Sequence, residues 1–156
     1  GLALLIGVKS TEREDYSTAI KYYQEAIKLT DDNTKKADCY KSISDIHYKE
    51  GRKAQARESA LKMVEVDPSR KDAYTIIGNL YFGSYNECRK GENPVNDRAV
   101  FFAAYEMYRR AGNQQGMANA QQQFPSMEEI FTYNMEVGQQ ISTGCWVNET
   151  VTIQRR

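Results

Sequence analysis

The stretch from Lys36 to Arg70 constrains the fold more than any other part of the sequence. A first set of residues recurs at positions i, i+3, i+4 and i+7, the spacing of one helix face: Tyr40, Ile43, Ser44 and His47. A second set continues at helical spacing after Gly51: Ala56, Ala60 and Met63. Pro68 cannot continue a helix and also restricts the residue before it, Asp67. The stretch therefore predicts two amphipathic helices, separated at Gly51 and ended at Asp67-Pro68.

This pair of helices repeats along the chain. The pattern returns about 34 residues further on, at Tyr74, Ile77, Gly78 and Tyr81. It also occurs slightly more than one period earlier, at Ile6, Gly7, Ala19, Tyr23 and Ala26. One such repeat cannot bury its apolar face alone, so consecutive repeats stack on one another. The sequence therefore predicts an all-α solenoid of about three helix pairs.

The third repeat is interrupted. Segment 83–96 is rich in turn-forming residues, where a regular repeat has only a short connection. Three further helices are expected after it, at 97–111, 114–124 and 126–133. The last of them begins with Ser126 and Glu129, which have the spacing of a capping box. We therefore expect a helical repeat domain at 1–125, with the insertion 83–96, followed by a capping helix and a β-hairpin at 126–156.

The β-hairpin is predicted because the period of the pattern changes to two after Gly138. One apolar or small set alternates with polar neighbours before the turn and another after it: Ile141, Thr143, Cys145 and Val147, then Val151 and Ile153. Asn148-Glu149 is expected as the turn, and this is also how we interpret the formal glycosylation sequon Asn148-Glu149-Thr150. A lone two-stranded hairpin is marginal in water, so this one must lie on the helices or pair with another chain.

The residues quoted from Ile6 to Tyr81 resemble the tetratricopeptide repeat, with small residues where helices cross, aromatic rings in the gaps and Asp-Pro at the close. This resemblance covers about two thirds of the chain and implies a right-handed α-solenoid that binds protein or peptide ligands. The tail, from QQFPSMEEIF to GCWVNETVTIQRR, is similar to the C-terminal end of tetratricopeptide proteins in the cell envelope of Bacteroidota-type bacteria. That similarity implies a periplasmic or outer-membrane-associated location, with the cytoplasm as the alternative.

The resemblance also implies a peptide-binding groove lined by the first helix of each repeat. The corresponding positions here are Asp38, Lys41, Asp45, Tyr48, Lys49, Asp72, Thr75, Ile76, Asn79 and Phe82. Tyr48 and Phe82 are expected to be exposed, and the alternative is that all ten are ordinary solvated helix positions. Family members that clamp a carboxylate terminus use Lys and Asn at positions occupied here by Leu4, Val8 and Asp45, so that activity is excluded.

Charge and motifs exclude several other classes of function. Lys and Arg number 21, as do Asp and Glu, so the chain lacks the basic excess of a nucleic-acid binder. No apolar run reaches the ~20 residues that cross a membrane. Sequence motifs for a metal, a phosphate or another cofactor are absent, and none is expected. The single histidine, His47, occupies a position where the repeat packs a large ring, so we expect it to be structural.

The three cysteines have no short-range pairing of the zinc-site type. Cys88 lies in the insertion and Cys145 in the hairpin, two irregular segments that need fastening, and we expect a disulfide between them. Cys39 lies within a helix and is expected to be a small buried apolar residue. The alternative is three reduced thiols in a cytosolic protein.

The function expected from these observations is a non-enzymatic protein-interaction scaffold, part of a larger envelope protein. One alternative is a carbohydrate-binding accessory protein, which the 11 Tyr residues permit. Another is an enzyme that uses Cys145, next to Trp146. Leu2 to Val8 is apolar nearly all round, so we expect a preceding repeat or a second copy to cover it, unless this end folds back. A chain that begins with Gly is expected to be a fragment of something longer.

Overall fold

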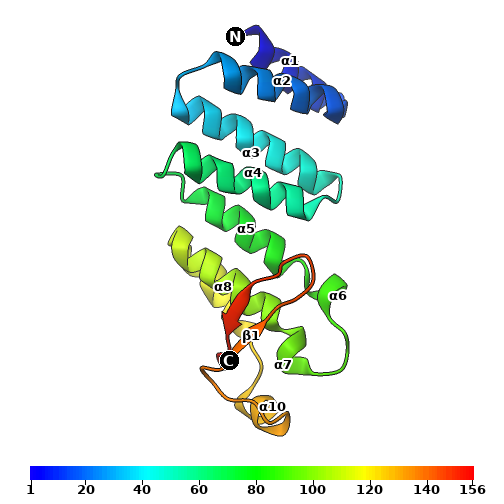
Figure 1. Ribbon diagram of the computed structural model, residues 1–156, viewed down its shortest axis with the longest axis vertical. Helices are drawn as coiled ribbons and strands as arrows, with labels where there is room; N and C mark the ends of the chain where they lie inside the picture. The colour runs from blue at the N-terminus through cyan, green and yellow to red at the C-terminus, as the bar shows by residue number, and fades with distance from the viewer. The chain divides into compact units, whose positions relative to one another are not determined.

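The computed structural model describes residues 1–156. It confirms the all-α solenoid class: the chain is mostly helical, neighbouring helices pack on one another, and one two-stranded antiparallel sheet lies near the C-terminus (Figure 1). The chain divides into two compact units, Gly1–Ala73 and Tyr74–Arg156. The boundary predicted between residues 125 and 126 falls inside the second unit and stays a prediction. None of the helices has both the length and the apolar character needed to span a bilayer.

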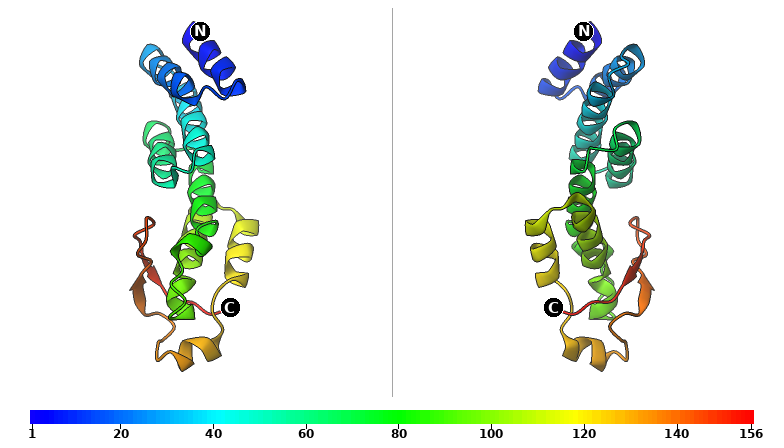
Figure 2. Two further views of the ribbon diagram at one scale, coloured as in Figure 1. Left: turned by 90° about the vertical axis from the view of Figure 1, so that its right-hand side faces the viewer. Right: turned by 90° about the vertical axis from the view of Figure 1, so that its left-hand side faces the viewer.

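Unit 1 contains two helical hairpins. Its helices are α1 Leu2–Glu12, α2 Tyr16–Leu29, α3 Asn33–Lys49 and α4 Lys53–Val66. Figure 2 shows α1 and α3 on one side of this unit and α2 and α4 on the other. Small residues let these helices approach: a Cβ atom on Gly7 would lie 3.1 Å from the ring of Tyr23. Ala19, Ala56, Ala60 and Met63, predicted from the repeat, have no exposed surface.

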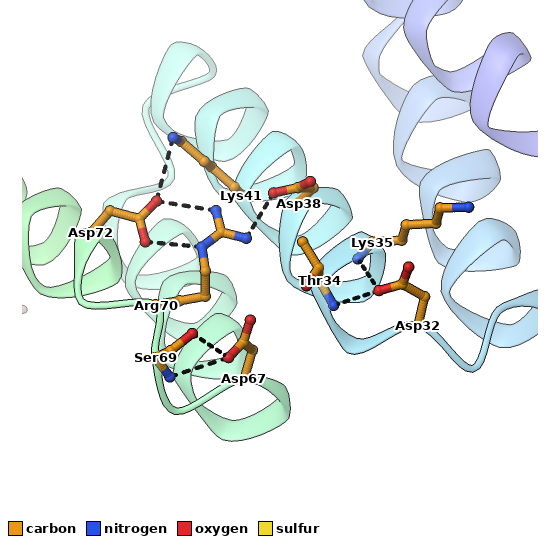
Figure 3. Close-up of polar contacts among 9 residues, drawn as sticks. All are labelled: Asp32, Thr34, Lys35, Asp38, Lys41, Asp67, Ser69, Arg70 and Asp72. Carbon is orange, nitrogen blue, oxygen red and sulfur yellow. Dashed lines mark hydrogen bonds and ion pairs between the residues drawn. The ribbon is translucent and has the colours of Figure 1, made fainter.

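Polar side chains are accommodated at the ends of these helices by local hydrogen bonds to the backbone. Asp32 starts α3 by accepting hydrogen bonds from the backbone N–H groups of Thr34 and Lys35, at 2.9 and 3.3 Å (Figure 3). Helix α1 continues to Glu12, so the polar residue Thr11 lies within its last turn. The Thr11 hydroxyl donates to the carbonyl of Gly7 at 2.9 Å, so this polar residue is accommodated inside the helix.

Unit 2 is built on a third, interrupted hairpin. Its helices are α5 Asp72–Phe82 (which begins at the end of unit 1), α6 Tyr85–Cys88, α7 Pro94–Asp97, α8 Ala99–Ala111, α9 Gln114–Gln122 and α10 Met127–Thr132. Helix α5 packs closely on α8, since a Cβ atom on Gly78 would lie 2.7 Å from the ring of Tyr108. The insertion is more regular than predicted: it contains two single-turn helices, and Asn93 caps the second of them.

The predicted C-terminal hairpin is confirmed, but its strands are shorter than expected. Strands β1 Gln140–Ser142 and β2 Thr150–Thr152 pair in antiparallel register, with Ile141 opposite Val151. The alternation predicted to run through Cys145 and Val147 is wrong, because Cys145 and Asn148 have positive φ angles of 57° and 47° that no strand can contain. Residues 143–149 form a loop instead, and the turn is wider than Asn148-Glu149.

The hairpin lies on the helices of unit 2. The indole N–H of Trp146 donates to Ser84 Oγ at 3.1 Å, and the Tyr81 hydroxyl donates to Glu149 at 3.1 Å. Val147, between these two contacts, is completely buried. Cys88 and Cys145 lie at disulfide distance, with their Cα atoms 5.6 Å apart. The loop of the hairpin is therefore attached to α5 and α6 at several points.

Candidate functional site

The outer face of α3 carries five of the predicted groove residues. Each of them lies three or four residues from another member of the set, which places them on one side of the helix: Asp38, Lys41, Asp45, Tyr48 and Lys49. All five are exposed. Tyr48 is the large ring among them, with 55% of its surface accessible. We call this set of residues the α3 face.

The charges of the α3 face are paired. Lys49 Nζ lies 3.1 Å from Asp45, one helical turn away, and this hydrogen bond raises the pKa of Lys49. Lys41 Nζ lies 3.4 Å from Asp72. About half of each Lys side chain is exposed, at 48% and 52%, so water and salt screen these pairs and they contribute little to stability. The face is therefore mixed in charge, with a tyrosine ring between fixed ion pairs.

Arg70 anchors one end of the α3 face (Figure 3). Its guanidinium group donates from Nε and Nη2 to the two carboxylate oxygens of Asp72, each at 3.1 Å, and from Nη1 to Asp38 at 2.7 Å. Only 17% of the Arg70 side chain is exposed, so this bidentate pair is the better-ordered part of the network. The pair lowers the pKa of Asp72 below its usual value.

Sequence reasoning missed Arg70, because a repeat pattern identifies helix faces and says little about the connection after the closing proline. The sequence did contain a signal for its role, because Arg70 lies two residues before the candidate groove residue Asp72 and shortly after Asp67-Pro68. An arginine placed next to acidic groove positions favours a bidentate ion pair.

The candidate residues of α5 in unit 2 are engaged within their own unit. Asn79 Oδ1 accepts a hydrogen bond of 2.6 Å from the hydroxyl of Tyr108, whose burial raises its pKa to about 12. Thr75 Oγ1 accepts from Asn113 at 3.4 Å. Phe82 was expected to be exposed, but it is half-buried with its ring edge against Phe101, at a centroid distance of 5.1 Å. Ile76 is also half-buried. Asn79 itself is exposed, but Thr75, Ile76 and Phe82 are half-buried, so this part of α5 offers less free surface than the α3 face.

Two residues singled out for their chemistry are embedded in unit 1. His47 is half-buried, and its Nδ1 accepts a hydrogen bond of 3.0 Å from Arg52 Nε. Loss of solvation, together with the charge of Arg52, lowers the pKa of His47, so the ring is neutral at pH 7. Cys39 is 3% exposed, and burial raises the pKa of its thiol. A buried thiol of this kind is inert.

Helix α1 exposes most of its apolar side chains. The most exposed are Leu2 at 72% and Leu5 at 54%, while Leu4 and Val8 are 37% and 39% exposed. At Leu4 and Val8, where the tetratricopeptide resemblance would place the polar donors of a carboxylate clamp, the chain presents hydrocarbon to water. Self-association through Leu2 to Val8 stays a prediction.

Two observations concern the other side chains that could carry chemistry. His, Cys, Asp and Glu residues form no group of three that could hold a metal ion. The sulfur of Cys145 lies at bonding distance from that of Cys88, so Cys145 is not available as a free nucleophile in this structure. This geometry argues against the alternative of an enzyme based on Cys145.

Comparison with known proteins supports the repeat interpretation. No model of a protein family matches the chain. Over 75 residues the chain is 27% identical to a curated protein, the Photosystem I assembly protein Ycf3 of Synechococcus sp. (strain CC9605), which contains tetratricopeptide repeats. The match covers 48% of this chain and 43% of that relative, so the chain spans less than half the relative's length. The chain is therefore similar to a tetratricopeptide-type helical repeat.

Proposed function

We propose that the chain is a non-enzymatic interaction scaffold of the tetratricopeptide type and that the α3 face is its contact surface in unit 1. The observation that carries the proposal is the exposed ring of Tyr48, 55% accessible, between the ion-paired charges of Asp45, Lys49 and Lys41. A tyrosine ring provides a large contact area at a small cost in conformational entropy, and aromatic residues are enriched where proteins bind one another. An extended peptide or a helix of a partner fits such a face.

The fixed charges on either side of Tyr48 give this surface selectivity. Each carboxylate of the α3 face already has a cationic partner, so a strongly charged ligand gains little and must break an existing pair. An uncharged or mixed-charge peptide with an apolar anchor suits the face better. Similarity to a relative named as an assembly protein supports a scaffold role in general and does not indicate the partner of this chain.

We also propose that the protein works in the periplasm or elsewhere in the cell envelope. The placement of Cys88 and Cys145 at disulfide distance supports this location, since disulfides persist in oxidising compartments. The cytoplasm is the alternative. Thiol titration of denatured protein purified from its native cell without reductant tests the proposal: one reactive thiol is expected, and three would refute it.

Site-specific photo-crosslinking in the native cell tests the scaffold proposal. A photoreactive phenylalanine derivative replaces Tyr48 in one variant and Leu61 in the other. Leu61 is a matched control, because it is 47% exposed but lies on α4, on the other side of unit 1. A specific protein adduct at position 48 that is absent at position 61 is expected. Equal labelling at both positions, or no protein adduct at position 48, would refute the assignment of the α3 face.

A further inference from the structure

A second set of exposed apolar side chains lies in unit 2, on α10 and the residues that follow it. Figure 1 shows where α10 lies in the chain. Four large side chains between Met127 and Val137 face solvent: Met127 at 51%, Phe131 at 80%, Tyr133 at 41% and Val137 at 48%. Met127 and Phe131 are one helical turn apart and therefore share a face. We call residues 127–137 the C-terminal apolar turn. Neighbouring exposed apolar side chains of this size mark interaction sites in soluble proteins.

The C-terminal apolar turn has a defined backbone conformation. Ser126 and Glu129 form a complete capping box, with hydrogen bonds of 3.1 and 3.0 Å between each side chain and the other residue's backbone N–H. Ile130 is completely buried beneath the turn, and its carbonyl accepts a hydrogen bond from the N–H of Met135 at 3.0 Å. Phe131 is therefore displayed on an anchored element, and a ligand would pay little to order it.

The stretch of sequence that carries this surface is acidic. Between residues 111 and 154 the sequence has four Glu residues and no Lys, Arg or His. Glu129 is engaged in the capping box, with the cationic groups of Arg98 and Arg156 near it. Glu128 and Glu136 are exposed and form no ion pair. A partner that contacts the turn would therefore meet two exposed carboxylates without an ion-pair partner beside the apolar side chains.

A cavity adjoins the turn and has the same sign of charge. It has a volume of about 570 Å³, and Met135 of the turn lines it together with α7 and β1. Its charged lining residues are Glu92, Asp97 and Lys90. The Asp97 carboxylate accepts hydrogen bonds from the backbone N–H groups of Lys90 and Gly91, at 2.8 and 3.0 Å. With two carboxylates and one ammonium group, the cavity suits a cationic or amide side chain.

We propose that the C-terminal apolar turn docks a basic, apolar-anchored segment of a protein partner. Apolar side chains of that segment pack on Phe131 and Met127, and its Lys or Arg residues lie near Glu128 and Glu136 or enter the cavity beside Glu92. The same charge repels phosphate groups, so nucleic acid and anionic lipid do not suit this surface. The assignment goes beyond the scaffold role of the α3 face and does not depend on it.

Binding of two matched amphipathic peptides, one of Leu and Lys and one of Leu and Glu, tests the proposal by calorimetry on the full chain. The Leu/Lys peptide is expected to bind, and the Leu/Glu peptide is not. Phe131→Ser should weaken binding of the Leu/Lys peptide about tenfold, as expected for a central apolar contact. Glu128→Gln combined with Glu136→Gln should weaken it less and reduce its dependence on salt. Tyr48→Ser, an exposed ring on the α3 face, should leave it unchanged.

Several results would overturn this assignment. They are equal binding of both peptides, no binding of the Leu/Lys peptide, or binding that Phe131→Ser leaves intact. Vesicles of zwitterionic phosphatidylcholine serve as a further probe, and binding to them through Phe131 would point to a lipid surface instead. Self-association that Phe131→Ser abolishes would point to a second copy. Phe131 is 80% exposed, so the variant should fold like the wild type, and circular dichroism checks this.

Discussion

Removal of the link between Cys88 and Cys145 should lower the free energy of unfolding by about 4 kcal/mol. The two cysteines are separated by 57 residues in the sequence. In the chain-entropy model, a cross-link that closes a loop of this size restricts the unfolded chain by about 4 kcal/mol. The loop contains most of unit 2, so the loss should apply to that unit as a whole. A Cys88→Ala, Cys145→Ala double variant makes the perturbation without leaving a free thiol.

The folded state of this variant should keep the hairpin in place. Trp146 remains bonded to Ser84 and packed on Tyr81, with a centroid distance of 5.6 Å, and Val147 remains buried. These contacts are independent of the sulfur atoms. The far-UV circular dichroism of the native state should therefore be unchanged, while the urea midpoint falls. If only the midpoint changes and the native state does not, the lost stability comes from the less restricted unfolded chain and not from lost packing in the folded state.

The single tryptophan makes the assay direct. Trp146 is next to Cys145, and its emission should report the unfolding of unit 2 in urea. Oxidised wild type, wild type in dithiothreitol and the double variant are compared, and the last two should have the same midpoint. Reductant should not change the double variant, which controls for effects on Cys39. Coincident midpoints for oxidised and reduced wild type, at equal slopes, would refute the reasoning.

Three further predictions concern one ion pair, one close contact between helices and one helix cap. Arg70→Met should cost about 2 kcal/mol, because it breaks the bidentate pair with Asp72; screening by water at the partly exposed Asp72 keeps the cost from being larger. The pKa of Asp72 is lowered in the folded state, so this contribution is present above the unfolded pKa of about 4 and is lost as the pH falls through the folded value. Urea midpoints for wild type and variant should therefore converge in acid, and a constant difference would contradict this account. Gly78→Ala should destabilise by about 1–3 kcal/mol, because its Cβ would meet the Tyr108 ring at 2.7 Å; a thermal midpoint at or above the wild-type value would contradict this. Ser126→Ala should cost about 1 kcal/mol through loss of the capping box, and hydrogen exchange should show faster opening of α10 only.

The repeat could be predicted from the sequence because helix stacking leaves a periodic signal. Small residues occur where helices approach closely, as Gly7 against Tyr23 shows. Caps are equally local: Ser126 and Glu129 are three residues apart, and their predicted capping box is present. Interactions between neighbours in the sequence, or between residues one period apart, are thus recoverable from one chain.

Features that depend on tertiary contacts could not be recovered in this way. The alternation after Gly138 indicated long strands, but the attachment of Trp146 and Cys145 to α5 and α6 requires a loop with positive φ angles. Arg70 reaches Asp38 across 32 residues, and no pattern of period two or 3.6 encodes such a pair. Likewise, Asn79 was placed in the groove by its repeat position, while its amide oxygen is bonded to Tyr108.

The net charge of the chain and the local charge of its surfaces lead to different expectations about binding. The net charge of the whole chain is zero, so the chain as a whole creates no strong electrostatic field that would attract a partner of one sign of charge. The basic residues are unevenly distributed, however, since all but Arg155 and Arg156 lie before residue 111. At physiological salt, charges act over about 8 Å, so a partner senses the local sign of a surface and not the sum over the chain. The α3 face pairs its charges and should bind ligands with weak salt dependence. The C-terminal apolar turn leaves Glu128 and Glu136 unpaired and should bind its partner more weakly as salt is added.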